Sequence, residues 1–169
     1  MKVLLTAEQI HERIVELGEK ITADYEGRSV TLLGVLTGSL MFVADLVREL
    51  KLPTRIAFLQ ASSYRGETTT PGQLAIHVGV APDVRGRDVL LLDDILDSGQ
   101  TLHDVIELVQ HLQPRSLRVG VLLRKRARQK VPLEPDYCGF EIPDAFVVGY
   151  GLDYNDEYRG LPYVGVLET

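Results

Sequence analysis

The stretch VLLLDDILDSGQTL (residues 89–102) runs from aliphatic residues into acids and then into a small, hydroxyl-rich turn. Residues 89–92 have the length and apolar character of a strand buried on both faces. Asp93 and Asp94 follow, then Asp97, and a helical pattern begins at Thr101. A buried strand, a tight turn and a helix in succession predict one unit of an α/β fold.

On both sides of this stretch, apolar runs of strand length alternate with amphipathic helical segments. We expect helices at 6–18 (extending toward 25), 40–50 and 101–112, and strands at 30–36, 55–61, 74–80, 89–92 and 117–123. This alternation predicts a single α/β domain with a mainly parallel, doubly wound sheet. Its core is expected at about residues 25–130. The tail after 131, rich in Gly, Pro and aromatics, is expected to form an irregular β appendage over the sheet's carboxyl edge, with a contribution from the N-terminus.

Bulk properties favour a cytoplasmic globular protein. The chain has 169 residues, 45% of them hydrophobic, and a net charge of −6, which does not favour electrostatic nucleic-acid binding. Cys138 is the only cysteine, so a disulfide framework and a cysteine-rich metal site are excluded. No apolar run approaches the length of a membrane helix, and the first residues do not resemble a signal peptide.

The acids and the turn after residues 89–92 suggest a ligand site. In a doubly wound sheet the carboxyl ends of the strands face the ligand crevice. Carboxylates there can accept hydrogen bonds from sugar hydroxyls or hold Mg²⁺, and backbone N–H groups at a helix start form an anion nest. This combination suits a ribose 5-phosphate ligand. An acidic strand end with a capping Asp or Ser is the simpler alternative, but it does not explain three acids within five residues.

The motif VLLLDDILDSGQTL resembles the phosphoribosyl diphosphate (PRPP) binding motif of type I phosphoribosyltransferases. The rest of the chain resembles, in order and spacing, the hypoxanthine–guanine phosphoribosyltransferases, in VLTGSLMFVADLVREL, SSYRGETTTPG, LLRKR and GFEIPDAFVVGYGLDYNDEYRGLPYVG. The resemblance covers nearly the whole chain. It implies the type I fold with a small hood formed largely by the C-terminal segment. It also implies purine salvage, in which a Mg²⁺-dependent transfer from PRPP to N9 of hypoxanthine or guanine gives IMP or GMP and pyrophosphate.

The resemblance assigns roles within the opening stretch. Asp93 and Asp94 would serve the ribose hydroxyls, with Asp93 also reaching Mg²⁺. Asp97 matches the family's general base at N7 of the purine, although capping the helix is its simpler role. The 5′-phosphate would be held by the turn that consists of Asp97, Ser98, Gly99, Gln100 and Thr101.

The purine site is carried over from the later motifs. Lys125 would donate to O6 of a 6-oxopurine, although the basic run Arg124–Lys130 is also typical of a solvated turn. Phe146 would stack on the base, and Val147 and Leu152 would read its edge through the backbone. Asp153 matches a Mg²⁺ ligand near pyrophosphate; without the resemblance it would pass for a surface charge.

The pyrophosphate site is predicted at Thr37 and Gly38, at Ser63 and Tyr64 of a mobile loop, and at Arg159. The family often has Lys or Arg where this chain has Thr37, and the peptide bond entering that position can be cis. Relatives form dimers and tetramers, so we expect a homo-oligomer without membrane or nucleic-acid partners. The alternatives are a PRPP-binding nucleic-acid regulator, a xanthine- or pyrimidine-preferring relative, and a generic nucleotide-binding protein.

Overall fold

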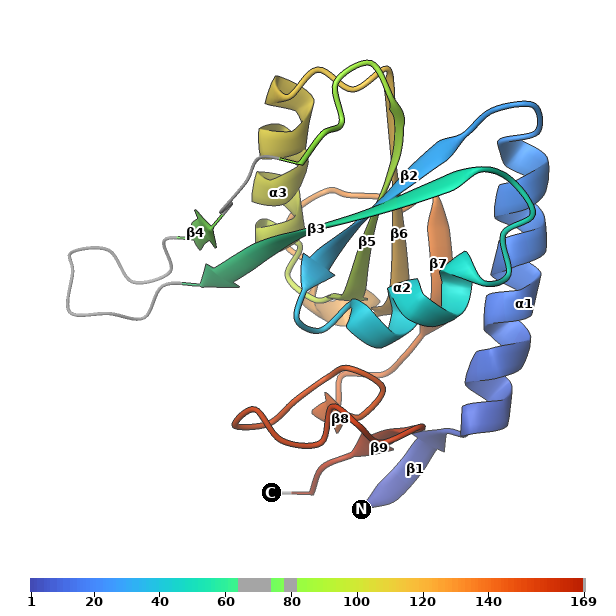
Figure 1. Cartoon of the computed structure of the whole chain (residues 1–169). Helices are drawn as coiled ribbons and strands as arrows, with labels where there is room; N and C mark the ends of the chain where they lie inside the picture. Colours follow the sequence, from blue (N-terminus) through green and yellow to red (C-terminus); the bar gives the residue numbers. More distant parts are fainter. Residues whose placement is uncertain (64–73, 78–81, 169) are drawn as a thin grey trace.

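The computed structural model describes residues 1–63, 74–77 and 82–168. These residues form two sheets and the helices that pack against them (Figure 1). The helices are α1 (Ala7–Asp24), α2 (Leu40–Val47) and α3 (Gln100–His111), with a short 3-10 turn at Arg126–Arg128. The strands are β1 (Lys2–Leu5), β2 (Val30–Leu36), β3 (Thr54–Ser63), β4 (Leu74–His77), β5 (Asp88–Leu96), β6 (Ser116–Arg124), β7 (Tyr137–Glu141), β8 (Val147–Val148) and β9 (Val164–Val166).

The central sheet has the strand order β4-β3-β2-β5-β6-β7. All neighbouring pairs are parallel except β3 with β4, which is antiparallel. The mainly parallel α/β architecture is therefore confirmed. We expected the whole tail after residue 131 to lie outside this sheet, but β7 joins it as an edge strand beside β6.

Helices cover both faces of the central sheet, as a doubly wound fold requires (Figure 1). Leu32, Leu90 and Leu92 pack in one apolar cluster with α1 and α2. Leu33 and Leu91 point the other way, into a second cluster with α3. Because successive strand residues face opposite sides, continuous apolar strands are needed to fill both clusters.

Two boundaries differ from the sequence-based expectation, and one agrees closely. Helix α1 begins after Thr6, whose hydroxyl accepts from the Gln9 N–H at 3.1 Å while the Gln9 side chain accepts from the Thr6 N–H at 2.8 Å. Helix α2 ends at Val47, earlier than expected. Strand β5 runs on to Leu96 because its pairing with β6 continues, so Asp93 and Asp94 lie inside the strand rather than after it.

The second sheet joins the two ends of the chain. Its order is β1-β9-β8, and both pairs are antiparallel. Figure 1 shows this second sheet beyond one end of the central sheet, the end at which the arrow of β2 finishes. The strands expected at 89–92 and 117–123 are confirmed within β5 and β6. Of the loop expected to carry Ser63 and Tyr64, Ser63 instead belongs to β3, and Tyr64 lies outside the described residues. No helix in the described part of the chain combines the length and apolarity needed to cross a membrane.

Candidate active site

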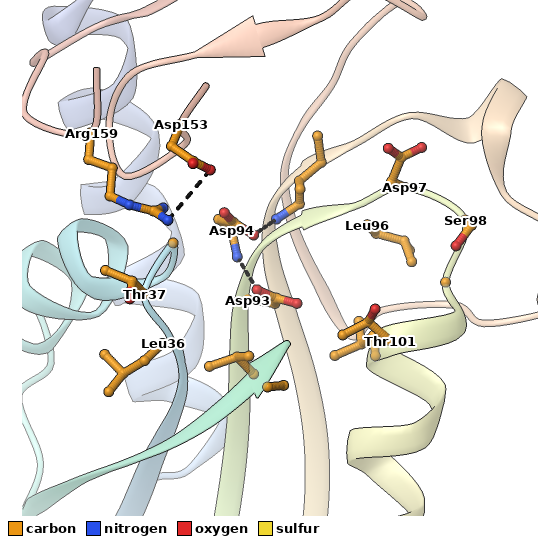
Figure 2. A pocket seen from close by; sticks show the side chains of 16 residues that line it. Leu36, Thr37, Asp93, Asp94, Leu96, Asp97, Ser98, Thr101, Asp153 and Arg159 are labelled. Carbon is orange, nitrogen blue, oxygen red and sulfur yellow. Dashed lines mark hydrogen bonds and ion pairs between the residues drawn. The ribbon is translucent and has the colours of Figure 1, made fainter. Parts of the chain in front are cut away.

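A cavity of about 290 Å³ opens at the carboxyl ends of β2 and β5. Figure 2 shows that side chains from separate parts of the chain face it. Its lining comprises Val35, Leu36, Thr37, Gly38, Ala61, Asp93, Asp94, Ile95, Leu96, Asp97, Ser98, Gly99, Thr101, Leu102, Asp153 and Arg159. The structure thus brings together most of the residues predicted for PRPP and pyrophosphate, from the opening stretch, the turn after β2 and the C-terminal segment.

The turn between β5 and α3 forms one wall of this cavity. Gly99 has φ 92°, a left-handed conformation that favours glycine, and it directly precedes the first residue of α3. The Gln100 N–H donates to the Ser98 hydroxyl at 3.3 Å, while the Gln100 side chain is exposed and outside the cavity lining. Backbone N–H groups at a helix start attract anions, so this wall suits a phosphate group.

The acid pair forms the floor. Asp93 is only 8% exposed, and its carboxylate accepts the Asp94 N–H at 2.8 Å. Burial, followed by the negative charge of Asp94, raises the pKa of Asp93 well above its ordinary value. Burial also raises the pKa of Asp94, against hydrogen bonds from Asp93 and Ile95 and the charge of Arg159. The buried Asp93 and the half-buried Asp94 lie side by side with little compensating positive charge, and a bound cation would relieve their repulsion.

Removing one of these acids is therefore expected to stabilise the protein. A carboxyl group whose pKa is raised on folding binds protons more tightly in the folded state, so its unfavourable contribution grows as pH rises above the ordinary value of 3.8. We expect Asp93→Asn, which keeps the acceptor for the Asp94 N–H, to raise the free energy of unfolding near pH 7 by about 1 kcal/mol. Urea denaturation at pH 4 and pH 7 checks this, and the gain should be smaller at pH 4. An unchanged or lower stability at pH 7 would contradict it.

Asp153 and Arg159 close the cavity from the C-terminal side. The Arg159 guanidinium lies 3.5 Å from an Asp153 carboxylate oxygen, a contact that Figure 2 marks, and it donates to the Gly151 carbonyl at 2.6 Å. The other Asp153 oxygen accepts the Asp156 N–H at 2.9 Å. The ion pair therefore places a cation and a carboxylate together at the rim.

The turn after β2 lies directly against this C-terminal segment. The Leu36–Thr37 peptide bond is cis, as the resemblance suggested, and the Thr37 side chain is exposed. A Cβ on Gly38 would come within 1.9 Å of Asp94 Oδ2, and one on Gly151 within 2.2 Å of the Gly38 carbonyl. Only glycines allow this approach, so the two turns and the acid pair form one closely packed wall.

Of the residues predicted for the purine, Asp153 lines this cavity, whereas Lys125, Phe146, Val147 and Leu152 do not. Lys125 follows β6 and is only 7% exposed, and its backbone N–H donates to the Leu96 carbonyl at 3.0 Å. Phe146 is 48% exposed, with its ring edge-on to Tyr154 at 5.7 Å between centroids. Val147 is buried within β8 of the second sheet, and Leu152 is buried in a bridge with Gly149.

Ser63 and Tyr64 were both predicted to contact the pyrophosphate. Ser63 ends β3, which places its backbone at the same edge of the sheet as the cavity. Tyr64 lies outside the described residues.

Sequence reasoning missed two residues at this site. Gly151 packs against the turn after β2. The feature of the sequence that could have indicated it is the GYG of the tail, residues 149–151. Arg128 forms an ion pair with Asp97 at 2.9 Å, but in the sequence it was one cation among several. Neither contact joins residues close in the chain, so no local pattern could reveal it.

The fold and the cavity define a phosphoribosyltransferase, and comparisons with known proteins agree. Residues 3–155 match the family model described as phosphoribosyl transferase domain. The chain belongs to this family.

Its relatives narrow the assignment to the hypoxanthine–guanine enzymes. The chain is 43% identical to the hypoxanthine-guanine phosphoribosyltransferase of Dictyostelium discoideum, over 99% of this chain and 95% of the relative. It is 42% identical to the bifunctional protein TilS/HprT of Listeria innocua, but spans only 26% of that longer protein. A crystal structure of a hypoxanthine-guanine phosphoribosyltransferase from Bacillus anthracis superposes with a TM-score of 0.93, at 38% identity and 99% coverage of both chains.

Proposed function

We propose that the chain transfers the phosphoribosyl group of PRPP to N9 of hypoxanthine or guanine in purine salvage, forming IMP or GMP and pyrophosphate. The observation that carries this proposal is the convergence on one cavity of the acid pair Asp93 and Asp94, a helix start and an arginine–aspartate pair. These groups suit a ribose, a phosphate and a diphosphate respectively. The similarity to hypoxanthine-guanine phosphoribosyltransferases supports the same reaction.

In the proposed reaction, the bond from N9 to the ribose C1′ forms while the bond from C1′ to the pyrophosphate oxygen breaks. The purine N7 proton passes to the Asp97 carboxylate, and pyrophosphate leaves with the bonding electron pair. Asp93 and Asp94 orient the ribose hydroxyls, and the turn Asp97–Thr101 fixes the 5′-phosphate. Arg159, Thr37 and Gly38 hold the diphosphate, to which the loop carrying Ser63 and Tyr64 would add on closing.

The cavity residues fit a magnesium ion. Asp93 and Asp153 both line the cavity and offer carboxylate oxygens, the ligands that Mg²⁺ prefers. When bound, the ion would neutralise the diphosphate leaving group. Asp153 now pairs with Arg159, so we expect it to exchange that contact on binding.

Lys125, Phe146, Val147 and Leu152 would form the purine site outside the present cavity. Asp153 lies next to Leu152 in the chain and lines the cavity, so it would connect the purine site with the diphosphate site. Lys125 is attached by its backbone to Leu96, one residue before Asp97. This backbone contact supports the proposed role of Lys125 as the donor to O6. A 6-oxopurine accepts such a bond, whereas the amino group of adenine does not.

Replacing Lys125 with Ala is expected to raise the Michaelis constant for hypoxanthine by about 10-fold or more, the effect of losing a charge-assisted hydrogen bond. The Michaelis constant for PRPP should stay nearly unchanged. Lys130→Ala is a matched control, because it removes the same charge from the same basic run. Initial rates with one substrate varied at a time measure both constants, and the opposite pattern would refute the role of Lys125.

We also propose that the β1-β9-β8 sheet, with its adjoining C-terminal turns, is the hood of a single domain. Its position beside the cavity and the contribution of Asp153 and Arg159 support this. We further propose a cytoplasmic homo-oligomer, either a dimer or a tetramer.

A spectrophotometric assay with PRPP, Mg²⁺ and each of hypoxanthine, guanine, xanthine and adenine tests the function. We expect turnover with hypoxanthine, and none with adenine. Tight PRPP binding without turnover of any base would favour a regulator instead, and preference for xanthine would move the chain to a related transferase.

A further inference from the structure

Arg128 connects Asp97 to the segment that leads to Phe146. It is the last residue of the 3-10 turn that follows Lys125. Its Nε lies 2.9 Å from an Asp97 carboxylate oxygen, and its Nη1 lies 3.6 Å from Asp144. An exposed ion pair ordinarily contributes little to stability, so the importance of this one depends on where it lies.

The backbone fixes Arg128 relative to Asp97. The Lys125 N–H donates to the Leu96 carbonyl at 3.0 Å, just before Asp97, and the Lys130 N–H donates to the Ser98 carbonyl at 2.8 Å, just after it. The segment carrying Arg128 is therefore attached on both sides of the acid. A guanidinium held in this way restricts the carboxylate to fewer orientations than free solvent would.

The contact leaves part of Asp97 available. Arg128 Nε donates to Oδ1, and in the portion of the chain that the structure describes no other side chain donates to this carboxylate. Asp97 lines the cavity, and Figure 2 shows it at the end of β5 above the turn with Ser98. Oδ2 can thus face a purine while Oδ1 stays anchored.

We propose that Arg128 is a positioning residue for the transfer reaction, which orients the Asp97 carboxylate so that its free oxygen meets the purine N7 proton. This inference rests on the proposed function. Asp144 steadies the guanidinium from the other side and links it to the segment that carries Phe146. Arg128 itself takes no proton and touches no reacting atom.

The test compares Arg128→Ala and Arg128→Lys with Arg126→Ala. Arg126 lies in the same 3-10 turn and pairs with Glu141 instead of Asp97, so its removal changes the net charge equally. We expect Arg128→Ala to lower kcat by about 10-fold. The general base is still present in this variant but is no longer oriented, so only part of its contribution to the rate is lost. Arg128→Lys should recover part of this loss, and Arg126→Ala should change kcat by less than about 2-fold. The Michaelis constant for PRPP should change little in all three.

A double-mutant cycle separates positioning from a structural role. If Arg128 acts through Asp97, then Arg128→Ala in an Asp97→Asn background should lower kcat by less than about 2-fold. Thermal unfolding of each variant shows whether the fold is kept. Equal losses with and without Asp97 would overturn the inference, as would a loss confined to the Michaelis constant for PRPP.

The outcome for the wild-type protein distinguishes the two proposals. An active wild type with Arg128→Ala indistinguishable from Arg126→Ala overturns the inference and leaves the proposed function intact. An inactive wild type overturns both.

Discussion

Replacing Asp97 with Asn is expected to lower kcat by about 10²–10⁴-fold, the range that a general base contributes. The amide keeps the shape of the carboxylate but cannot accept the N7 proton. The backbone N–H groups of the turn remain in place, so the dissociation constant for PRPP should change by less than about 3-fold. Single-turnover rates and PRPP titrations measure the two effects separately.

Asp104→Asn is the matched control. Asp104 lies on α3 one turn beyond the phosphate turn and accepts from the Gln100 side chain at 3.0 Å, outside the cavity. Its substitution should leave kcat within about 2-fold of wild type. A comparable weakening of turnover and PRPP binding in Asp97→Asn would instead assign Asp97 to binding.

Gly38→Ala is expected to lower kcat/KM for PRPP by at least about 10²-fold. The added Cβ would meet Asp94 Oδ2 at 1.9 Å and the Asp94 carboxyl carbon at 2.7 Å, so the turn after β2 or the acid pair must shift. Displacement of binding groups by about 1 Å can reduce catalysis by this factor. Overpacking should also lower the free energy of unfolding by about 1–3 kcal/mol.

Gly160→Ala provides the control for this substitution. Gly160 lies in the C-terminal segment next to Arg159, and no neighbouring atom lies within 4 Å of an added Cβ. We expect activity and stability close to wild type. Normal PRPP kinetics in Gly38→Ala would contradict the assignment of this turn to the diphosphate.

The sequence predicted the central sheet because buried parallel strands carry a strong local signal. Residues 30–36 form β2 with the expected bounds, and the Thr6–Gln9 capping box marks the start of α1. The YCGF stretch of β7 is strand-like, but nothing in it indicates that the strand joins the central sheet. Only its first residue, Tyr137, is buried, and its place at the sheet edge depends on long-range pairing with β6.

The site was predictable to the extent that its residues are adjacent in the chain. Asp93 to Thr101 form one continuous stretch, and the chemistry of a strand end followed by a helix start is local. Arg159 and Asp153 reach the same cavity only through tertiary folding, and without a family resemblance they would pass for surface charges. The contact of Arg128 with Asp97 depends on the side-chain geometry of an exposed turn, which composition does not determine.

The most direct test is a crystal structure of the protein with PRPP and Mg²⁺. We expect the 5′-phosphate against the N–H groups of residues 97–101, the ribose over Asp93 and Asp94, and the diphosphate between Gly38 and Arg159. Density for PRPP elsewhere, with this cavity filled only by solvent, would contradict it.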